Sequence, residues 1–331
     1  MAASTSKMPT LVAVTLLILA VACRASPYYP LQMGYYHEKC PQAEAIVKGV
    51  MKKAVYQNPG IGAGVIRMLF HDCFVEGCDA SVLLDPTPFS PTPEKLSAPN
   101  NPSLRGFELI DEIKCAVEAA CPGVVSCADI IAFAARDASY FLSGGRVYFD
   151  MPAGRRDGTF SNASEPLKFL VPPTSNLSEL VTSFTDKGMS AEDLVVLSGA
   201  HTVGRSHCSS FVSDRLAVPS DIDGGLAKFL RSRCPANTTD SDDPTVMLDV
   251  VTPNKMDNQY YKNALGHKVL LNSDAELLMS PETAKMVEDN AKIPGWWEDR
   301  FKKAMVKMAS IEVKTGHKGE IRKNCRAINH Y

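Results

Sequence analysis

The sequence predicts an all-α protein, and three observations support this class. Apolar residues recur at helical spacing in several segments, and residues typical of helix ends flank many of these segments. The chain has 331 residues, of which 45% are hydrophobic, enough to build a substantial core. No internal repeat and no interdomain linker is visible, so we expect residues 26–331 to form one domain.

The predicted helices follow one another along the whole chain. Pro41 suits a first helical turn, and apolar residues at helical spacing continue that helix to Val55. Ser190, with Asp193 three residues later, is a typical helix N-cap, and Ser280 precedes another helix. The further predicted helices span about 60–73, 104–120, 126–142, 177–187, 191–199, 281–291 and 297–310.

Two long irregular segments, 85–102 and 146–175, interrupt the predicted helices. Loops of this length in a compact domain are usually functional, or are held by disulfides and ions. We therefore expect both segments to border a site or to be tethered.

The first 25 residues predict a secretory signal peptide. Lys7 precedes an apolar run that ends at Cys23, and cleavage is expected near Ala25, with Ala22 as the alternative. The run is short for a membrane span, and no later stretch is long and apolar enough to be one. We therefore expect a secreted protein that has no membrane partner.

The charge balance gives no reason to expect an anionic partner. The whole chain has a formal net charge of -2, and removal of the signal peptide, with Lys7 and Arg24 but no acid, changes it to -4. A mildly acidic chain is poorly suited to nucleic acid. Nucleic acid is therefore not an expected partner.

Cysteines and glycosylation sequons agree with export. The chain has 10 cysteines, and loss of Cys23 leaves an odd number, so at least one is unpaired in an oxidising compartment. Sequons at Asn162, Asn176 and Asn237 predict surface glycans. Asn176 is the weakest of them, because it also fits a helix N-cap paired with Glu179.

The helix that ends near residue 73 carries a pair of side chains suited to proton chemistry. Arg67 and His71 are four residues apart and share one helix face, so both can contact the same small ligand. The alternative for His71 is a structural histidine that is merely hydrogen-bonded.

Oxygen donors follow this helix. Asp72, Asp79 and Ser81 flank a turn at Gly77 that directs backbone carbonyls toward them, and oxygen ligands of this kind are those that calcium requires. An alternative is a zinc site formed by His71, Cys73 and Cys78. The oxidising route and the oxygen-rich surroundings favour a disulfide between the two cysteines.

A second histidine, His201, lies at the end of a strongly apolar helix between two glycines, which permit close approach of a large group. Histidine is the common axial ligand of haem iron, so two histidines on separate apolar helices could face each other across a flat cofactor. The alternative for His201 is a structural histidine of the core whose ring nitrogens are hydrogen-bonded within the protein.

A third polar region follows at residues 248–261. Asp249, Thr252 and Asp257 suit a second calcium site, which Thr202 would couple to His201. Helix caps are the alternative for these residues.

Six motifs in order make the chain resemble a secreted plant haem peroxidase of class III, over nearly all of the mature sequence. These motifs are Arg67–Ser81, Val124–Asp129, Ala135–Asp137, Pro152–Asp157, Leu197–Thr202 and Gly319–Arg322. The resemblance implies haem b between a distal half, about residues 26–165, and a proximal half, about residues 166–331.

The resemblance implies roles for residues on the distal side of the haem. His71 would be the acid-base residue, and Arg67 would stabilise developing negative charge. Asn100 would hydrogen-bond His71 and keep it basic, with Glu94 extending that network. Phe70 would shield the oxidised iron beside the haem plane.

On the proximal side, the resemblance implies that His201 ligates the iron and donates a hydrogen bond to Asp274. The carbonyl of Pro152, together with Arg67, would receive a phenolic donor at the exposed haem edge.

The resemblance also implies four disulfides and two calcium ions. The disulfides would be Cys40–Cys121, Cys73–Cys78, Cys127–Cys325 and Cys208–Cys234, which leaves Cys115 unpaired. The distal calcium would bind Asp72, Val75, Gly77, Asp79 and Ser81. The proximal calcium would bind Thr202, Asp249, Thr252, Lys255 and Asp257. Lys255 departs from the apolar residue expected there, and its ammonium group would weaken calcium binding.

The implied activity is the reduction of hydrogen peroxide to water through a ferryl intermediate, with one-electron oxidation of small phenolic donors. Lignification, wall cross-linking and oxidative stress responses are roles that fit such chemistry. We expect a monomer in the extracellular space or cell wall. The alternative is a catalytically silent haem-binding cell-wall protein.

Overall fold

The helices of the computed structural model confirm the all-α class. The structure describes residues 30–217, 219–236 and 242–329, so the predicted signal peptide and Asn237 lie outside the described residues. The helices before residue 150 are α2 (Ala43–Gln57), α3 (Pro59–Cys73), α4 (Phe107–Ala120) and α5 (Cys127–Leu142). Those after it are α6 (Pro166–Phe169), α7 (Leu177–Asp186), α8 (Ala191–Ser198), α9 (Gly224–Arg233), α10 (Gln259–Leu265), α11 (Asn272–Ala275), α12 (Pro281–Lys292) and α13 (Trp296–Met308).

Every predicted helix is present, but α6, α9, α10 and α11 were not predicted. Two glycines begin α9, and glycine lowers helix propensity, so the local pattern there is weak. The side chain of Asp223 nevertheless caps α9 by accepting a hydrogen bond from the backbone N–H of Leu226. The other three helices are short, which leaves few residues in which a helical period can be recognised.

Side-chain caps fix the starts of the helices that lead to the two histidines. Asn58 accepts a hydrogen bond from the backbone N–H of Gly60 at the start of α3, and Pro59 occupies the first helical turn. Ser190 and Asp193 form a reciprocal capping box at the start of α8. The same device caps α7, where Asn176 is the N-cap residue, as its sequence context predicts.

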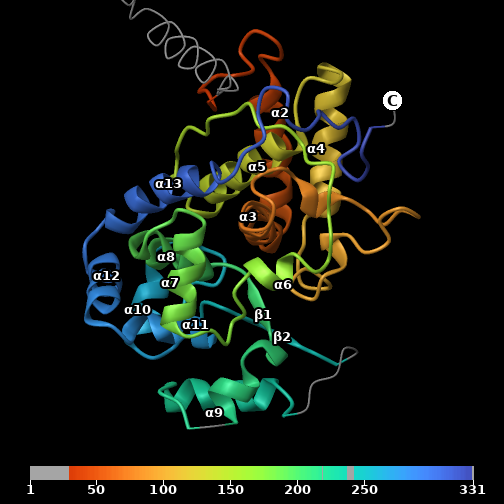
Figure 1. Cartoon of the computed structure of the whole chain (residues 1–331). Helices are drawn as coiled ribbons and strands as arrows, with labels where there is room; N and C mark the ends of the chain where they lie inside the picture. The colour runs from red at the N-terminus through yellow and green to blue at the C-terminus, as the bar shows by residue number, and fades with distance from the viewer. Residues whose placement is uncertain (1–29, 218, 237–241, 330–331) are drawn as a thin grey trace, which may run out of the picture.

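Helix α3 packs against α2 and α5 near the middle of the molecule (Figure 1). A side chain at Gly62 would come within 3.0 Å of Leu142 and 3.1 Å of Val55, so this glycine lets the three helices pack closely. The inner face of α5 is fully buried and includes Ile130 and Phe133. This packing holds α3 rigidly while its other face remains available to a cavity.

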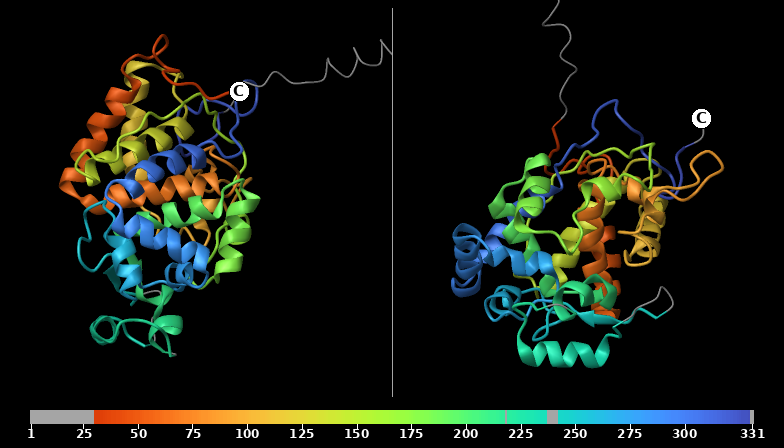
Figure 2. Two further views of the ribbon diagram at one scale, coloured as in Figure 1. Left: turned by 90° about the vertical axis from the view of Figure 1, so that its left-hand side faces the viewer. Right: turned by 60° about the horizontal axis from the view of Figure 1, so that its bottom comes forward.

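A two-stranded antiparallel sheet follows the second histidine. Strand β1 (Arg205–His207) pairs with β2 (Thr245–Met247), so that Ser206 lies opposite Val246. Helix α9 lies beyond this sheet at one end of the molecule (Figures 1 and 2). Its apolar side packs with the Cys208–Cys234 disulfide in a small hydrophobic cluster of its own.

The described residues contain four disulfides, which are the same pairs that the resemblance implies. They are Cys40–Cys121, Cys73–Cys78, Cys127–Cys325 and Cys208–Cys234. Among the cysteines in the described ranges, Cys115 is unpaired, and its side chain is exposed on α4. Because Cys73 and Cys78 are joined to each other, the alternative of a zinc site at these thiols is wrong.

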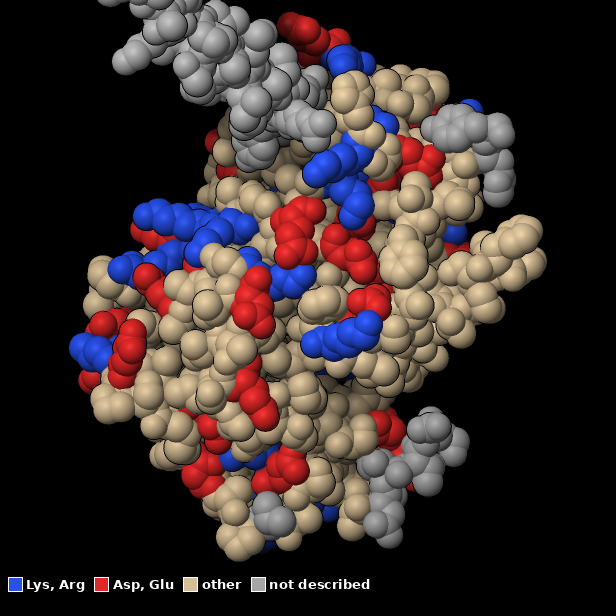
Figure 3. Space-filling view, viewed as in Figure 1, with Lys and Arg blue, Asp and Glu red and all other residues tan. Residues whose placement is uncertain are grey.

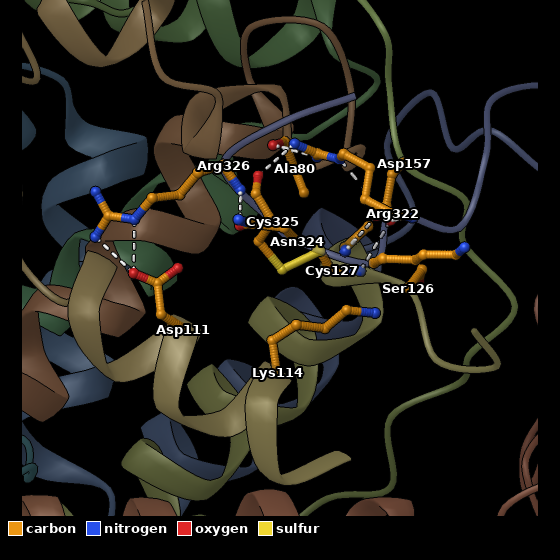
Figure 4. The surroundings of a disulfide bond; sticks show 12 residues. Ala80, Asp111, Lys114, Ser126, Cys127, Asp157, Arg322, Asn324, Cys325 and Arg326 are labelled. Atoms are coloured by element: carbon orange, nitrogen blue, oxygen red, sulfur yellow. Dashed lines mark hydrogen bonds and ion pairs between the residues drawn. A yellow bond between two sulfur atoms is a disulfide. The ribbon is translucent and has the colours of Figure 1, made fainter. Parts of the chain in front are cut away.

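The Cys127–Cys325 disulfide ties the C-terminal segment to α5 (Figure 4). Next to it, fully buried Arg322 donates a hydrogen bond to the backbone carbonyl of Ala80 at 2.6 Å, and its own backbone N–H donates to Asp157 at 2.8 Å. Arg326 pairs with Asp111 of α4 at 2.6 Å. The C-terminal segment therefore supports the loop that follows α3.

Positive and negative side chains are interspersed over most of the face shown in Figure 3. Among the residues that the structure describes, no helix is both long enough and apolar enough to cross a membrane.

Candidate active site

A cavity of about 890 Å³ lies between α3 and the segment that follows α8. Both His71 and His201 line it, the first from α3 and the second from a short 3₁₀ helix, Gly199–Thr202, that continues α8. Most of the remaining lining is apolar and includes Phe184, Leu194 and Met305. Two histidines that are remote in sequence thus face one largely apolar space.

The hydrogen bonds of His71 determine which ring nitrogen carries its proton. The side-chain amide of Asn100 donates to the backbone carbonyl of Glu94 at 2.7 Å, which turns Asn100 Oδ1 toward Nδ1 of His71 at 2.6 Å. An amide oxygen only accepts, so Nδ1 of His71 must be the protonated nitrogen. Burial, followed by the nearby charge of Arg67, lowers the pKa of His71 well below its ordinary value. The ring is therefore neutral, with Nε2 left as a free base.

Glu94 takes part in this network through its backbone, not its carboxyl group. Its side chain is buried, and within the described residues neither carboxyl oxygen has a hydrogen-bond partner. Burial, and then the charges of Asp72 and Asp79, raise the pKa of Glu94 to about 9. The carboxyl group thus lies against the oxygen cluster that follows α3.

Arg67 is held at the wall of the same cavity. Its guanidinium donates to the hydroxyl of Ser103 at 2.9 Å and to the carbonyl of Pro99 at 2.8 Å. Burial, together with the charge of Arg105, lowers its pKa to about 10, so Arg67 remains a cation at neutral pH. Phe70, on the same helix, also lines the cavity.

His201 is oriented from the opposite side by Asp274. Its Nδ1 lies 2.8 Å from Asp274 Oδ1, and Asp274 is only 2% exposed. Burial disfavours a charged His201, but Asp274 more than offsets this effect and raises the pKa. With Nδ1 bound to the carboxylate, Nε2 is the nitrogen available to the cavity.

The residue predicted to contact the donor, Pro152, lies next to Arg155. Pro152 is buried and is not among the residues that line the cavity, and its carbonyl accepts a hydrogen bond from Arg155 at 2.7 Å. Arg155 is itself paired with Asp129 in the interior. The cavity lining includes a mostly apolar group of residues, here called the rim: Leu167, Leu170, Val171, Pro172, Pro173 and Ser210.

The residues around the cavity fit a haem group. Apolar walls suit a flat macrocycle, and the Nε2 atom of His201 can serve as an axial ligand. Arg105 and Arg205 line one part of the wall and can pair with the two haem carboxylates. A side chain at Gly64 would come within 2.8 Å of the Arg105 carbonyl, so this glycine lets α3 lie close to the Arg105 segment.

The oxygen donors after α3 converge on a buried cluster. Asp72 and Asp79 are essentially unexposed, and the free oxygens Asp72 Oδ1 and Ser81 Oγ have no hydrogen-bond partner within the described residues. Burial, and then the charge of Asp79, raise the pKa of Asp72 well above its ordinary value. Gly77 has a φ of 81°, and a side chain there would come within 2.5 Å of the Glu312 carbonyl. Unpaired buried oxygens near two carboxylates suit a hard cation.

Two lysines from other segments contact this cluster. Lys314 forms an ion pair with Asp79, and Lys187 donates to the carbonyl of Val75 at 3.2 Å. Neither contact could be predicted from the sequence, because each lysine is more than 100 residues away from its partner. They bring positive charge to the site that was expected to bind calcium.

The second oxygen cluster lies directly after His201. The hydroxyl of Thr202 is 3.1 Å from Asp249, and the hydroxyl of Thr252 is 3.3 Å from Asp249 and 3.2 Å from Asp257. The carbonyl of Lys255 lies 3.4 Å from the Thr202 hydroxyl. All the expected proximal ligands are therefore close together, and the ammonium of Lys255 lies 3.3 Å from the other oxygen of Asp257.

Neither oxygen cluster resembles a site for a softer metal. Within the described ranges, no three His, Cys, Asp or Glu side chains gather in a way that could hold a metal ion. A cation at either cluster would depend on hydroxyl and carbonyl oxygens as well as carboxylates, which is typical of calcium.

Tyr260 is among the site residues that were not predicted from the sequence. Tyr260 is buried in α10, and its hydroxyl donates to Asp274 Oδ1 at 2.8 Å, the atom that also binds His201. The neighbouring pair Tyr260-Tyr261 is visible in the sequence, but nothing local indicates which of the two contacts Asp274.

A family model described as "Peroxidase" matches residues 47–292. The chain is 79% identical to Peroxidase 2 of Zea mays over the full length of both chains. It is 46% identical to Peroxidase 1 of Zea mays, covering 99% of this chain and 92% of the relative. It is 45% identical to Peroxidase 5 of Vitis vinifera, covering 98% and 99%.

Proposed function

Because the chain belongs to the plant peroxidase family and is a peroxidase, we propose that His71 and Arg67 act on hydrogen peroxide and that small phenols donate the electrons. The observation that carries this assignment is the shared cavity of His71 and His201, in which each ring has its Nδ1 occupied. Each histidine thus presents Nε2, one as a base and the other as a ligand.

Membership of the haem peroxidase family implies haem as the cofactor. His201 would hold it through Nε2, and Arg105 and Arg205 would pair with its carboxylates. When bound, haem supplies a redox centre that takes two oxidising equivalents from peroxide and gives them up one at a time.

His71 moves one proton within the peroxide. Its neutral Nε2 takes the proton from one oxygen of H₂O₂ and returns it to the other oxygen, which leaves as water. The bond to Asn100 keeps Nδ1 protonated throughout, so the same nitrogen receives and returns the proton. His71 is thereby restored to its starting state.

Arg67 favours the same bond cleavage electrostatically. Negative charge develops on the departing oxygen before the proton reaches it, and a fixed guanidinium in a buried cavity stabilises that charge. The contacts with Ser103 and Pro99 hold the guanidinium in place, which limits the cost of reorganisation.

The phenolic donor would approach at the rim formed by Leu167, Leu170, Val171, Pro172, Pro173 and Ser210. This rim is mostly apolar and suits an aromatic ring. Each donor gives up one electron and one proton, so two donors and one peroxide yield two water molecules and two phenoxyl radicals. The carbonyl of Pro152, which accepts a hydrogen bond from Arg155, remains a second candidate contact for the donor.

Two calcium ions would complete the enzyme. The distal ion would bind Asp72, Val75, Gly77, Asp79 and Ser81, and the proximal ion would bind Thr202, Asp249, Thr252, Lys255 and Asp257. The unpaired oxygens of Asp72 and Ser81 support the first site, and the convergence on Thr202 supports the second. A divalent cation would also relieve the repulsion that raises the pKa of Asp72.

Secretion to the extracellular space or cell wall is the localisation we propose. The disulfides of the described residues are consistent with an oxidising compartment. Asn176 is exposed, and Asn162 is partly exposed. Glycosylation remains a proposal for both and for Asn237.

The visible absorption spectrum of the secreted protein tests this function. A ferric Soret band that changes with one equivalent of peroxide and returns on addition of guaiacol is the expected result. A Soret band that peroxide leaves unchanged would support the alternative of a silent haem-binding protein. Absence of a Soret band would refute the haem site.

A further inference from the structure

Asp274 Oδ1 accepts hydrogen bonds from two side chains in different segments. Nδ1 of His201 and the hydroxyl of Tyr260 each lie 2.8 Å from this one oxygen. Asp274 is 2% exposed, so little water competes for the oxygen. In this water-poor environment, each of the two hydrogen bonds reduces the negative charge on the Asp274 oxygen and so weakens the second bond to the same oxygen.

From this shared oxygen we infer that Tyr260 is a positioning residue of the proximal side, which limits how much negative charge Asp274 transfers to His201. A carboxylate that accepts one donor attracts that proton strongly and gives the imidazole more anionic character. A second donor reduces this attraction. Tyr260 would therefore set the strength of His201 as a ligand without touching the haem.

The surrounding packing holds Tyr260 in this position. Its ring is 2% exposed and meets the rings of His201 and Tyr261 edge-on, at centroid distances of 6.1 Å and 5.0 Å. Tyr261 in turn donates to the carbonyls of Val195 and Val196 in α8, at 2.9 Å and 3.1 Å. These hydrogen bonds join α10 to α8, while the burial of the Tyr260 ring keeps its own hydroxyl beside Asp274.

The adjacent Tyr261 provides a matched control. Both tyrosines are buried in α10, and both hydroxyls are hydrogen-bonded, but that of Tyr261 binds backbone carbonyls and not Asp274. Replacing either tyrosine by phenylalanine deletes one buried hydroxyl and preserves the ring. Only Tyr260→Phe removes a donor from Asp274.

The test compares the haem-loaded wild type with Tyr260→Phe and Tyr261→Phe. We expect Tyr260→Phe to raise the iron–histidine stretching frequency in resonance Raman spectra of the reduced protein. It should also favour the ferric state, changing the ferric-to-ferrous ratio at a fixed potential by roughly tenfold, which corresponds to about 59 mV for one electron. Tyr261→Phe should leave both quantities unchanged.

A second comparison shows whether the effect passes through Asp274. In an Asp274→Asn background, Tyr260→Phe should produce no further shift, since the shared carboxylate is gone. The inference is overturned if Tyr260→Phe leaves the frequency and the potential unchanged, or if Tyr261→Phe shifts them equally.

This inference rests on the proposed ligation of iron by His201, and the two can fail separately. A wild-type protein without an iron–histidine band would refute the proposed ligand. A wild-type band that Tyr260→Phe does not move would refute only the role of Tyr260.

Discussion

The hydroxyl of Thr202 lies 3.1 Å from Asp249, although 47 residues separate them in the sequence. Thr202 directly follows His201, so this contact joins the second oxygen cluster to the histidine that faces the cavity. Asp249 also accepts hydrogen bonds from the backbone N–H groups of Val251 and Thr252, at 2.7 Å and 2.9 Å. A substitution of Asp249 will therefore remove a contact that supports the backbone next to His201.

Replacing Asp249 by alanine should destabilise the protein and abolish binding at the proposed proximal calcium site. The backbone groups and the hydroxyl that it accepts from would lose their partner, which costs about 2–4 kcal/mol in the free energy of unfolding. Thermal unfolding with calcium and with a chelator measures this loss, and the difference between the two conditions should shrink in the variant. Asp299→Ala, at an exposed ion pair with Lys302, should change stability by less than about 0.5 kcal/mol. If Asp249→Ala and Asp299→Ala lowered the stability equally, the assignment of Asp249 as a calcium ligand would be contradicted.

His71→Leu should lower kcat/KM for hydrogen peroxide by about 100- to 10,000-fold, the usual contribution of a general acid-base residue. The haem Soret band should remain, because His201 lies on the other side of the cavity. Stopped-flow measurement of the peroxide reaction tests this expectation. His37→Leu is the control, since His37 is exposed and remote from the cavity lining. A variant of His71 with normal rates would exclude it as the base.

On the acid side of the pH profile, kcat/KM for peroxide should fall only below pH 6.5, the ordinary pKa of histidine. The reason is that burial and the charge of Arg67 lower the pKa of His71. We call this part of the profile the acid limb. The reaction needs the neutral ring, so the rate falls as pH falls through this depressed pKa. Removing the cation in Arg67→Leu should move the limb to higher pH, whereas Arg67→Lys should keep it low. The pH profile of kcat/KM for peroxide measures both. A wild-type limb above the ordinary value would show that His71 does not titrate as described.

The mature protein should contain one reactive thiol. Cys115 is unpaired and exposed among the described cysteines, and the expected signal peptide removes Cys23. Titration with a thiol reagent should detect one equivalent in the folded protein and none in Cys115→Ser. Peroxidase activity should be the same in both, because Cys115 does not line the cavity. Two or more equivalents in the wild type would show that a disulfide is incomplete.

The sequence predicted most of the fold because its long helices carry strong local signals. The capping pairs of α7 and α8 and the apolar spacing of α3 and α5 depend on neighbours within one or two helical turns. The sheet formed by β1 and β2 could not be predicted, because each strand has only three residues and its partner is 40 residues away. Helix α9 was missed because its glycines weaken the pattern, and tertiary packing with the Cys208–Cys234 disulfide compensates for them.

The sequence predicted those site residues whose types are fixed by a motif. It did not predict the contacts that form between segments distant in the sequence. His71 and His201 line one cavity, Asn100 is hydrogen-bonded to His71, and Asp274 lies beside His201. The contact between the buried Arg155 and the carbonyl of Pro152 is one that no spacing rule reveals, and the role of Pro152 as a donor contact stays a prediction. The positive charges of Lys187 and Lys314 beside the oxygen cluster that follows α3 could likewise not be predicted, since both lysines are distant in the sequence.

Lys314→Met should increase the affinity of the distal site for calcium. The ammonium of Lys314 pairs with Asp79, so a calcium ion bound there must share the carboxylate with a fixed positive charge. Lys314 is partly exposed, and solvent screens this repulsion, so we expect an increase of several-fold, on the order of 1 kcal/mol. Competition with a fluorescent calcium chelator measures the affinity. Lys303→Met, at an exposed position of α13, should leave it unchanged.

The same substitution should act in the opposite direction without calcium. In the absence of the ion, the ammonium of Lys314 partly neutralises the negative charge of the buried Asp79. Without this lysine, the carboxylates of Asp79 and Asp72 repel each other more strongly. Lys314→Met should therefore unfold at a lower temperature than the wild type in a chelator, and the gap should narrow or reverse as calcium is added. A calcium affinity equal to or lower than that of the wild type would contradict competition between the lysine and the ion. Equal stability in the chelator would show that Lys314 does not compensate the cluster.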